Sequence, residues 1–125
     1  MVEKFIADVP SNIWAENRPA SRNTWESSFN VASWVRVSGA QGKFALYVVH
    51  EDGAGTHRTL VDEAVSTGEG SSLLSSQVRL LFTKKVTNVR ITLELEDPAM
   101  RHQVEELYMQ LKDSQQQSRK LIANY

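Results

Sequence analysis

The stretch VASWVRVSGAQGKFALYVVHEDG, residues 31–53, carries the strongest structural signal in this chain. Apolar residues alternate with other residues on both sides of Gly39 and Gly42, which is the period of a half-buried β-strand. A turn at Ala40-Gln41 predicts a β-hairpin made of the two halves. This register pairs Val35 with Leu46 on one face and Trp34 with Tyr47 on the other.

Both faces of this predicted hairpin carry apolar side chains, so we expect something to cover each of them. The protein itself offers two covers for the face of Trp34 and Tyr47: a C-terminal helix, or the N-terminal segment with its tryptophans. The sequence favours such an internal cover. The alternative is a ligand or a protein partner, because exposed aromatic rings stack on sugars and anchor interfaces. The candidate ligand-binding residues are then Trp34, Tyr47, Arg36 and Trp25.

Residues 29–96 as a whole predict five or six short strands joined by turn-rich pieces such as EDGAGTH and STGEGSS. A second hairpin is expected between Leu74 and Leu95, with its turn around Lys84–Thr87. One of its faces is apolar and the other is polar, which is typical of an antiparallel sheet with one side in solvent. We therefore predict a mainly β fold, an antiparallel β-sandwich of jelly-roll-like type.

The two ends of the chain lack this alternation. Residues 1–28 predict an irregular N-terminal segment packed on the domain, with a short strand near Lys4–Asp8. Residues 97–125 predict a C-terminal α-helix, because Asp97 is a good N-cap and Pro98 suits the first helical position. An apolar stripe at helical spacing follows, formed by Met100, Val104, Leu107, Tyr108 and Leu111. All three zones belong to one domain in this prediction.

The far end of the predicted helix is the candidate oligomer contact. The segment KDSQQQSRK is polar all round, and the apolar residues return only at Leu121, Ile122 and Tyr125. We expect this end to project from the sheet and to meet another subunit or a neighbouring domain, with a frayed tail as the simpler interpretation.

The bulk composition excludes several classes of function. The net charge of −1 gives no electrostatic case for nucleic acid or an anionic membrane as partner. The chain has no cysteine, so thiol chemistry and cysteine-ligated zinc are excluded. The start MVEKFIADVP lacks the pattern of a signal peptide, so the localisation expected by default is cytoplasmic, unless the chain is a fragment of a secreted protein.

Residues with catalytic or metal-binding chemistry cluster only around His50. His50, Asp52 and His57 are candidate metal ligands, since imidazole and carboxylate bind zinc or manganese. Their spacing matches no familiar metal motif, so the sequence favours a solvated turn beside an edge histidine. It also contains no nucleophile elbow, phosphate-binding glycine loop or dinucleotide fingerprint. We expect no catalytic residues, no cofactor and no bound metal.

Three segments, SWVRVSG, GKFALYVVHEDG and VTNVRITLELED, together resemble consecutive strands of jelly-roll carbohydrate-binding modules. The resemblance covers roughly residues 29–97 and implies a β-sandwich that binds a carbohydrate. The chain departs from that pattern at SSLLSSQVRLL, where a tryptophan is usual, and in its predicted C-terminal helix.

Three functions remain open from the sequence. The first is a non-catalytic binding module for a carbohydrate-like ligand or a protein partner. The second is a structural or assembly protein, a homo-oligomer formed through the C-terminal helix. The third is a metal-dependent enzyme that uses His50, Asp52 and His57.

Overall fold

The computed structural model describes residues 1–14, 18–111 and 119–121, and most of these residues lie in β-strands. The elements in chain order are β1 (Val2–Asp8), α1 (Ser11–Trp14), β2 (Arg18–Ser21), β3 (Thr24–Ser38), β4 (Gly42–Asp52), β5 (Gly55–Ser66), β6 (Ser71–Phe82), β7 (Val86–Leu95), β8 (Arg101–Leu111) and β9 (Arg119–Leu121). No helix among the described residues has the length and apolarity needed to cross a membrane.

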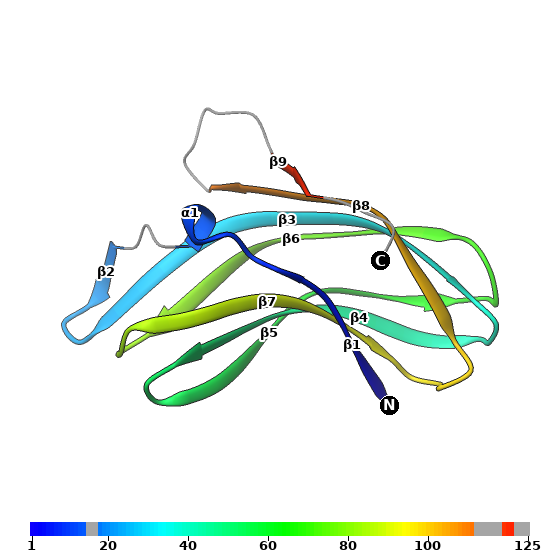
Figure 1. Cartoon of the computed structure of the whole chain (residues 1–125), viewed down its shortest axis with the longest axis horizontal. Helices are drawn as coiled ribbons and strands as arrows, with labels where there is room; N and C mark the ends of the chain where they lie inside the picture. The colour runs from blue at the N-terminus through cyan, green and yellow to red at the C-terminus, as the bar shows by residue number, and fades with distance from the viewer. Residues whose placement is uncertain (15–17, 112–118, 122–125) are drawn as a thin grey trace.

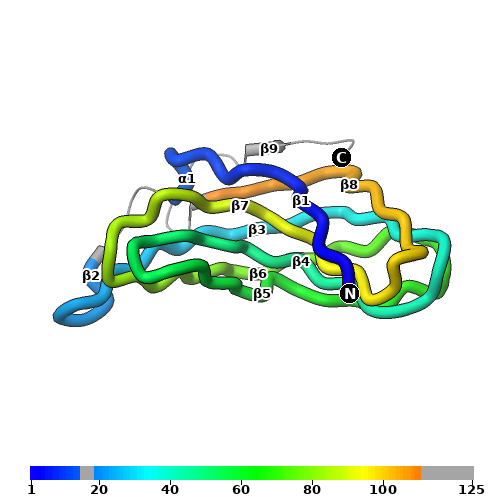
Figure 2. Tube along the Cα trace, turned by 60° about the horizontal axis from the view of Figure 1, so that its bottom comes forward, coloured from blue at the N-terminus to red at the C-terminus, as the bar shows by residue number. Residues whose placement is uncertain are grey.

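The strands form two antiparallel sheets that face each other (Figure 1). Sheet I has the order β1-β7-β4-β5. Sheet II is built around β3, which pairs with β6 along one edge and with β8 along the other; β2 also pairs with β3, and β9 pairs with β8. Figure 2 shows the same two layers from another side. The mainly β, two-sheet prediction is confirmed.

A single apolar core lies between the sheets. The predicted alternation is correct on β3, where Phe29, Val31, Val35 and Val37 are all buried. It is also correct on β4, β6 and β7, whose inward residues join the same cluster: Phe44, Leu46, Val48, Leu74, Val78, Leu80, Val89, Ile91, Leu93 and Leu95. Burial of alternate residues on facing sheets is what holds such an arrangement together.

The predicted pairing of strands is wrong in both hairpins. β3 and β4 lie in opposite sheets, and so do β6 and β7. Trp34 pairs with Leu73 and Glu106, whereas Tyr47 pairs with Leu60 and Thr92. The alternation is the same for a hairpin and for a chain that crosses to the other sheet, because both put the same residues in the core.

Gly39 shows how the chain makes the first crossing. Its φ of +92° lies in the left-handed region that favours glycine, and a Cβ built there would lie 2.6 Å from the backbone oxygen of Ala99. The glycine therefore allows a tight corner and a close approach of the link between β7 and β8.

The predicted C-terminal helix is also wrong over residues 101–111, which form β8. A β-bulge explains the error. Trp34 pairs with Glu106 and Val35 with Val104, so Glu105 is the extra residue. The bulge separates two core residues, Val104 and Leu107, by three positions instead of two, and this spacing imitates a helix.

The structure does not show the helix on which the predicted oligomer contact was based. Ile122 and Tyr125 lie outside the described residues, and Leu121 ends β9, where it pairs with Leu107. Without a described projecting helix, nothing in the described chain supports assembly through this end.

The N-terminal segment is more regular than expected. Residues 1–28 contain β1, α1, β2 and the start of β3, and β1 pairs with β7 at the edge of sheet I. Two hydrogen bonds hold Trp14 in place. The Trp14 indole N–H donates to the Val9 carbonyl at 2.9 Å, and the Ser27 hydroxyl on β3 donates to the Trp14 carbonyl at 2.8 Å.

Candidate functional site

The outer face of sheet II carries an exposed tryptophan in the middle of its central strand. Because Val35 points into the core, its neighbour Trp34 must point outward, and Trp34 is 41% exposed. Leu73, its partner on β6, is 48% exposed. Trp34 and Leu73 therefore place two neighbouring exposed apolar side chains on this face.

Polar and charged side chains surround this ring. An open hollow of about 500 Å³ is lined by Trp34, Gln103, Glu105 and Glu106. The Glu105 carboxylate lies 3.6 Å from the guanidinium of Arg36 and accepts a hydrogen bond from the Ser71 hydroxyl. The hollow therefore combines one stacking surface with several hydrogen-bonding groups.

The β-bulge in β8 accounts for the two adjacent carboxylates. Val104 and Leu107 are fully buried, so the intervening Glu105 and Glu106 both lie on the outer side of the strand. The buried Ser33 hydroxyl donates to the Glu106 carbonyl at 2.8 Å, which fixes the strand beside the bulge. Bulges often redirect side chains in this way next to functional sites.

A second hollow of about 310 Å³ continues along the same two strands. Its outward residues are Asn30 and Ala32 on β3 and Tyr108 and Gln110 on β8. The Tyr108 hydroxyl donates to the Glu106 carboxylate, which links the two hollows. Together they form a track of mixed polar and apolar groups, with the rings of Trp34 and Tyr108, along the seam between β3 and β8.

The structure brings together only part of the predicted ligand platform. Trp34 and Arg36 share the outer face of β3. Tyr47 lies on the other sheet, and the guanidinium of Arg58 covers its ring at 4.1 Å. Trp25 is 44% exposed but lies nine residues from Trp34 along β3, roughly 30 Å at the rise of an extended strand.

Ion pairs hold the Arg58 guanidinium over the Tyr47 ring. Arg58 lies 2.7 Å from the Glu94 carboxylate and 3.6 Å from that of Glu3. The Tyr47 ring is therefore already stacked against a side chain of the protein.

Sequence reasoning missed Leu73, Gln103, Glu105, Glu106 and Tyr108 at this face. Leu73 occupies an outward position in the alternation of β6, so the signal was present, but its pairing with β3 was not predicted. The other four lie on β8, which was interpreted as a helix.

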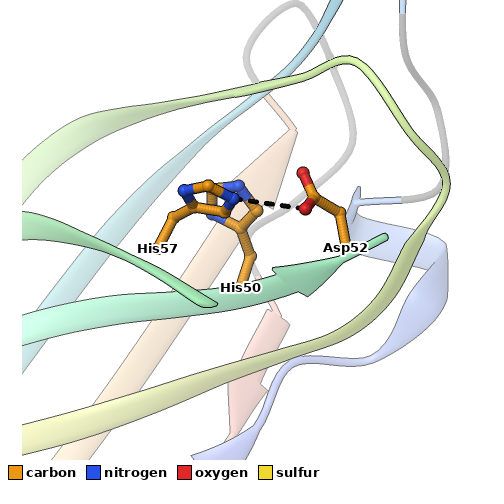
Figure 3. Close-up of side chains that lie close together, drawn as sticks. All are labelled: His50, Asp52 and His57. Atoms are coloured by element: carbon orange, nitrogen blue, oxygen red, sulfur yellow. Dashed lines mark hydrogen bonds and ion pairs between the residues drawn. The ribbon is translucent and has the colours of Figure 1, made fainter. Parts of the chain in front are cut away.

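The candidate metal ligands do come together at one end of the sandwich (Figure 3). His50 near the end of β4 pairs directly with His57 near the start of β5, and their rings stack with centroids 4.8 Å apart. Asp52 Oδ1 lies 3.2 Å from His57 Nε2 and accepts a hydrogen bond from the Ala54 N–H at 2.8 Å.

His50 is the unusual member of this cluster. The residue is only 3% exposed, and neither ring nitrogen makes a hydrogen bond of normal geometry, although the Leu81 carbonyl acts on one of them. Burial lowers its pKa below 6.5, and the neighbouring His57 lowers it further, while Asp52 and the Leu81 carbonyl act in the opposite direction. His50 is therefore a neutral imidazole at neutral pH.

Asp52 has the opposite tendency, to remain charged. Its side chain is 2% exposed, and burial alone would raise its pKa. The hydrogen bonds from Ala54 and His57, and the charges of the two histidines, outweigh burial and hold the pKa below its usual value. At neutral pH the cluster thus combines neutral His50 with a carboxylate.

Comparisons of the chain with protein-family models, with curated proteins and with solved structures found no match.

Proposed function

We propose that the protein is a non-catalytic binding module whose ligand lies on the outer face of sheet II, with a carbohydrate-like molecule as the ligand class. The observation that carries the proposal is the 41% exposure of Trp34 at the centre of that face. An indole held by a rigid strand loses little conformational freedom on binding, and it presents a flat apolar surface.

The surroundings of Trp34 favour a sugar. A sugar ring has an apolar C–H face that can stack on the indole, and hydroxyl groups at its edge. Carboxylate, amide and guanidinium groups bind hydroxyls well, and Glu106, Gln103 and Arg36 supply them around the hollow. Two carboxylates against one guanidinium favour a neutral sugar over an acidic one.

The strand order supports the same interpretation. From β3 to β8 the chain alternates between the sheets except at the β4–β5 hairpin, with β1-β7-β4-β5 facing β6-β3-β8. This is the connectivity expected of a jelly roll, the fold of the carbohydrate-binding modules that the strand segments resemble. A fold does not determine a function, so the exposed indole remains the main argument.

The test is a screen of the protein on gels containing soluble polysaccharides and on a panel of immobilised oligosaccharides. Trp34→Ala should weaken binding by about fivefold to thirtyfold, since one stacked ring contributes roughly 1–2 kcal/mol. Trp25→Ala is the matched control, because Trp25 is a tryptophan of similar exposure on the same strand. Equal losses in both variants, or no binding by the unmodified chain, would count against the proposal.

A further inference from the structure

We propose that His50, Asp52 and His57 form a binding site for a divalent transition-metal ion of the zinc type. This site lies at the β4–β5 turn and is independent of the ligand face around Trp34. It rests on the geometry of three side chains and on the environment of His50.

The three side chains offer a suitable set of ligand atoms. Two imidazoles and one carboxylate are a common zinc set that leaves one position for water. One ligand atom from each residue lies within 4.8 Å of the other two. Ligand atoms around a tetrahedral zinc ion lie about 3.3 Å apart, so the set closes with side-chain shifts of roughly 1.5 Å.

The hairpin that carries these residues is rigid. His50 and His57 are direct cross-strand partners, and Asp52 pairs with Gly55 at the end of the same ladder. The Ala54 N–H holds the Asp52 carboxylate from below the turn. Ligands held by paired strands lose little freedom when an ion binds, which favours affinity.

The buried imidazole of His50 points to a ligand. Neither of its nitrogens makes a hydrogen bond of normal geometry, although one of them faces the Leu81 carbonyl, and burial of a polar atom without a full hydrogen bond is unfavourable. A stacked histidine pair with one His57–Asp52 hydrogen bond leaves that cost uncompensated. An ion bound by one nitrogen of His50 would compensate it.

The access to the cluster also fits. The His57 side chain is 44% exposed, so the ion and its water can enter from that side without opening the core.

The experiment is a titration of untagged, EDTA-treated and dialysed full chain with zinc chloride. Isothermal titration calorimetry should give about one ion per chain, and the melting temperature should rise with zinc. His57→Ala removes one ligand, and Asp52→Asn replaces the anionic carboxylate by a neutral amide, so each should weaken zinc binding by at least about tenfold. His102→Ala is the control, because His102 is a histidine outside the cluster.

A second readout identifies the ligands directly. The chain contains only three histidines, so ¹⁵N NMR spectra of the imidazole rings are simple to assign. Zinc should shift the ring signals of His50 and His57 and leave those of His102 in place. The proposal is overturned if zinc neither binds nor raises the melting temperature, or if His102→Ala loses binding as the cluster variants do. The zinc titration does not depend on sugar binding, so a failure of the polysaccharide screen would leave its result unchanged.

Discussion

Replacing Met109 by Ala should destabilise the protein far more than replacing its neighbour Tyr108 by Ala. Met109 is 1% exposed and belongs to the core, whereas Tyr108 lies on the outer face of β8. Removal of a fully buried methionine side chain costs about 2–5 kcal/mol, through lost burial and the cavity that remains. In a chain of this size, that corresponds to a drop in melting temperature on the order of 10–20 °C.

The expected effect of Tyr108→Ala is smaller. The ring leaves an open dent in place of a closed cavity, and the variant loses the hydrogen bond to Glu106, so the cost is about 1 kcal/mol. The assay is urea denaturation followed by tryptophan fluorescence. The free energies of unfolding of the two variants are compared after checking that their m-values equal that of the unmodified chain. An apolar helical stripe would contain Tyr108 and exclude Met109. A larger loss of unfolding free energy for Tyr108→Ala than for Met109→Ala would therefore refute the conclusion that residues 101–111 form a β-strand with a bulge at Glu105.

Three further predictions follow from other parts of the fold. In chelator-treated protein, the free energy of unfolding should fall as the pH drops below about 6.5. The pKa of His50 is lowered in the folded state, so the unfolded chain takes up the proton first. His50→Leu should flatten this dependence in denaturation curves measured across a series of pH values. Gly39→Ala should cost about 2 kcal/mol or more, because its Cβ would meet the Ala99 backbone oxygen, while Gly55→Ala, at positive φ but with no atom within 4 Å, should cost less by thermal melting. Tyr47→Ala should lower stability and leave any sugar affinity unchanged in a calorimetric titration, because Tyr47 lies under Arg58 on the opposite sheet; a loss of affinity equal to that of Trp34→Ala would contradict the assigned face.

The alternation of apolar residues predicted which side of β3, β4, β6 and β7 faces the core. Val35 and Leu46, Leu80 and Ile91 are buried as expected. Alternation reports the face of a strand and carries no information about its neighbour. The partner of β3 could therefore not be read from residues 31–53, because β6 and β8 are remote in sequence.

The C-terminal segment failed for a local reason. One extra residue at Glu105 changed the spacing of two buried residues from two to three, and Asp97 and Pro98 look like a helix start. The Asp97 side chain does cap the following turn, since it accepts a hydrogen bond from the Ala99 N–H at 2.8 Å. The same residue types stabilise a turn and a helix N-terminus, so the signal was real but ambiguous.

The two candidate sites differ in how much of them could be predicted. Trp34 and Arg36 come from one strand at a spacing of two, so their shared face was predictable. Leu73 and Glu105 reach that face only through pairing across the sheet. The His50–His57 cluster is local, because the β4–β5 turn is a true hairpin, and its members were therefore found from sequence proximity alone.

The most direct test of the binding face uses the three tryptophan indoles as separate reporters. A ¹H–¹⁵N spectrum should contain one indole signal each for Trp14, Trp25 and Trp34. Titration with the best oligosaccharide from the screen should shift the Trp34 signal, whereas Trp14, bonded to the Val9 carbonyl, and Trp25, at the far end of β3, should stay in place. An unmoved Trp34 signal at saturating ligand would contradict the account.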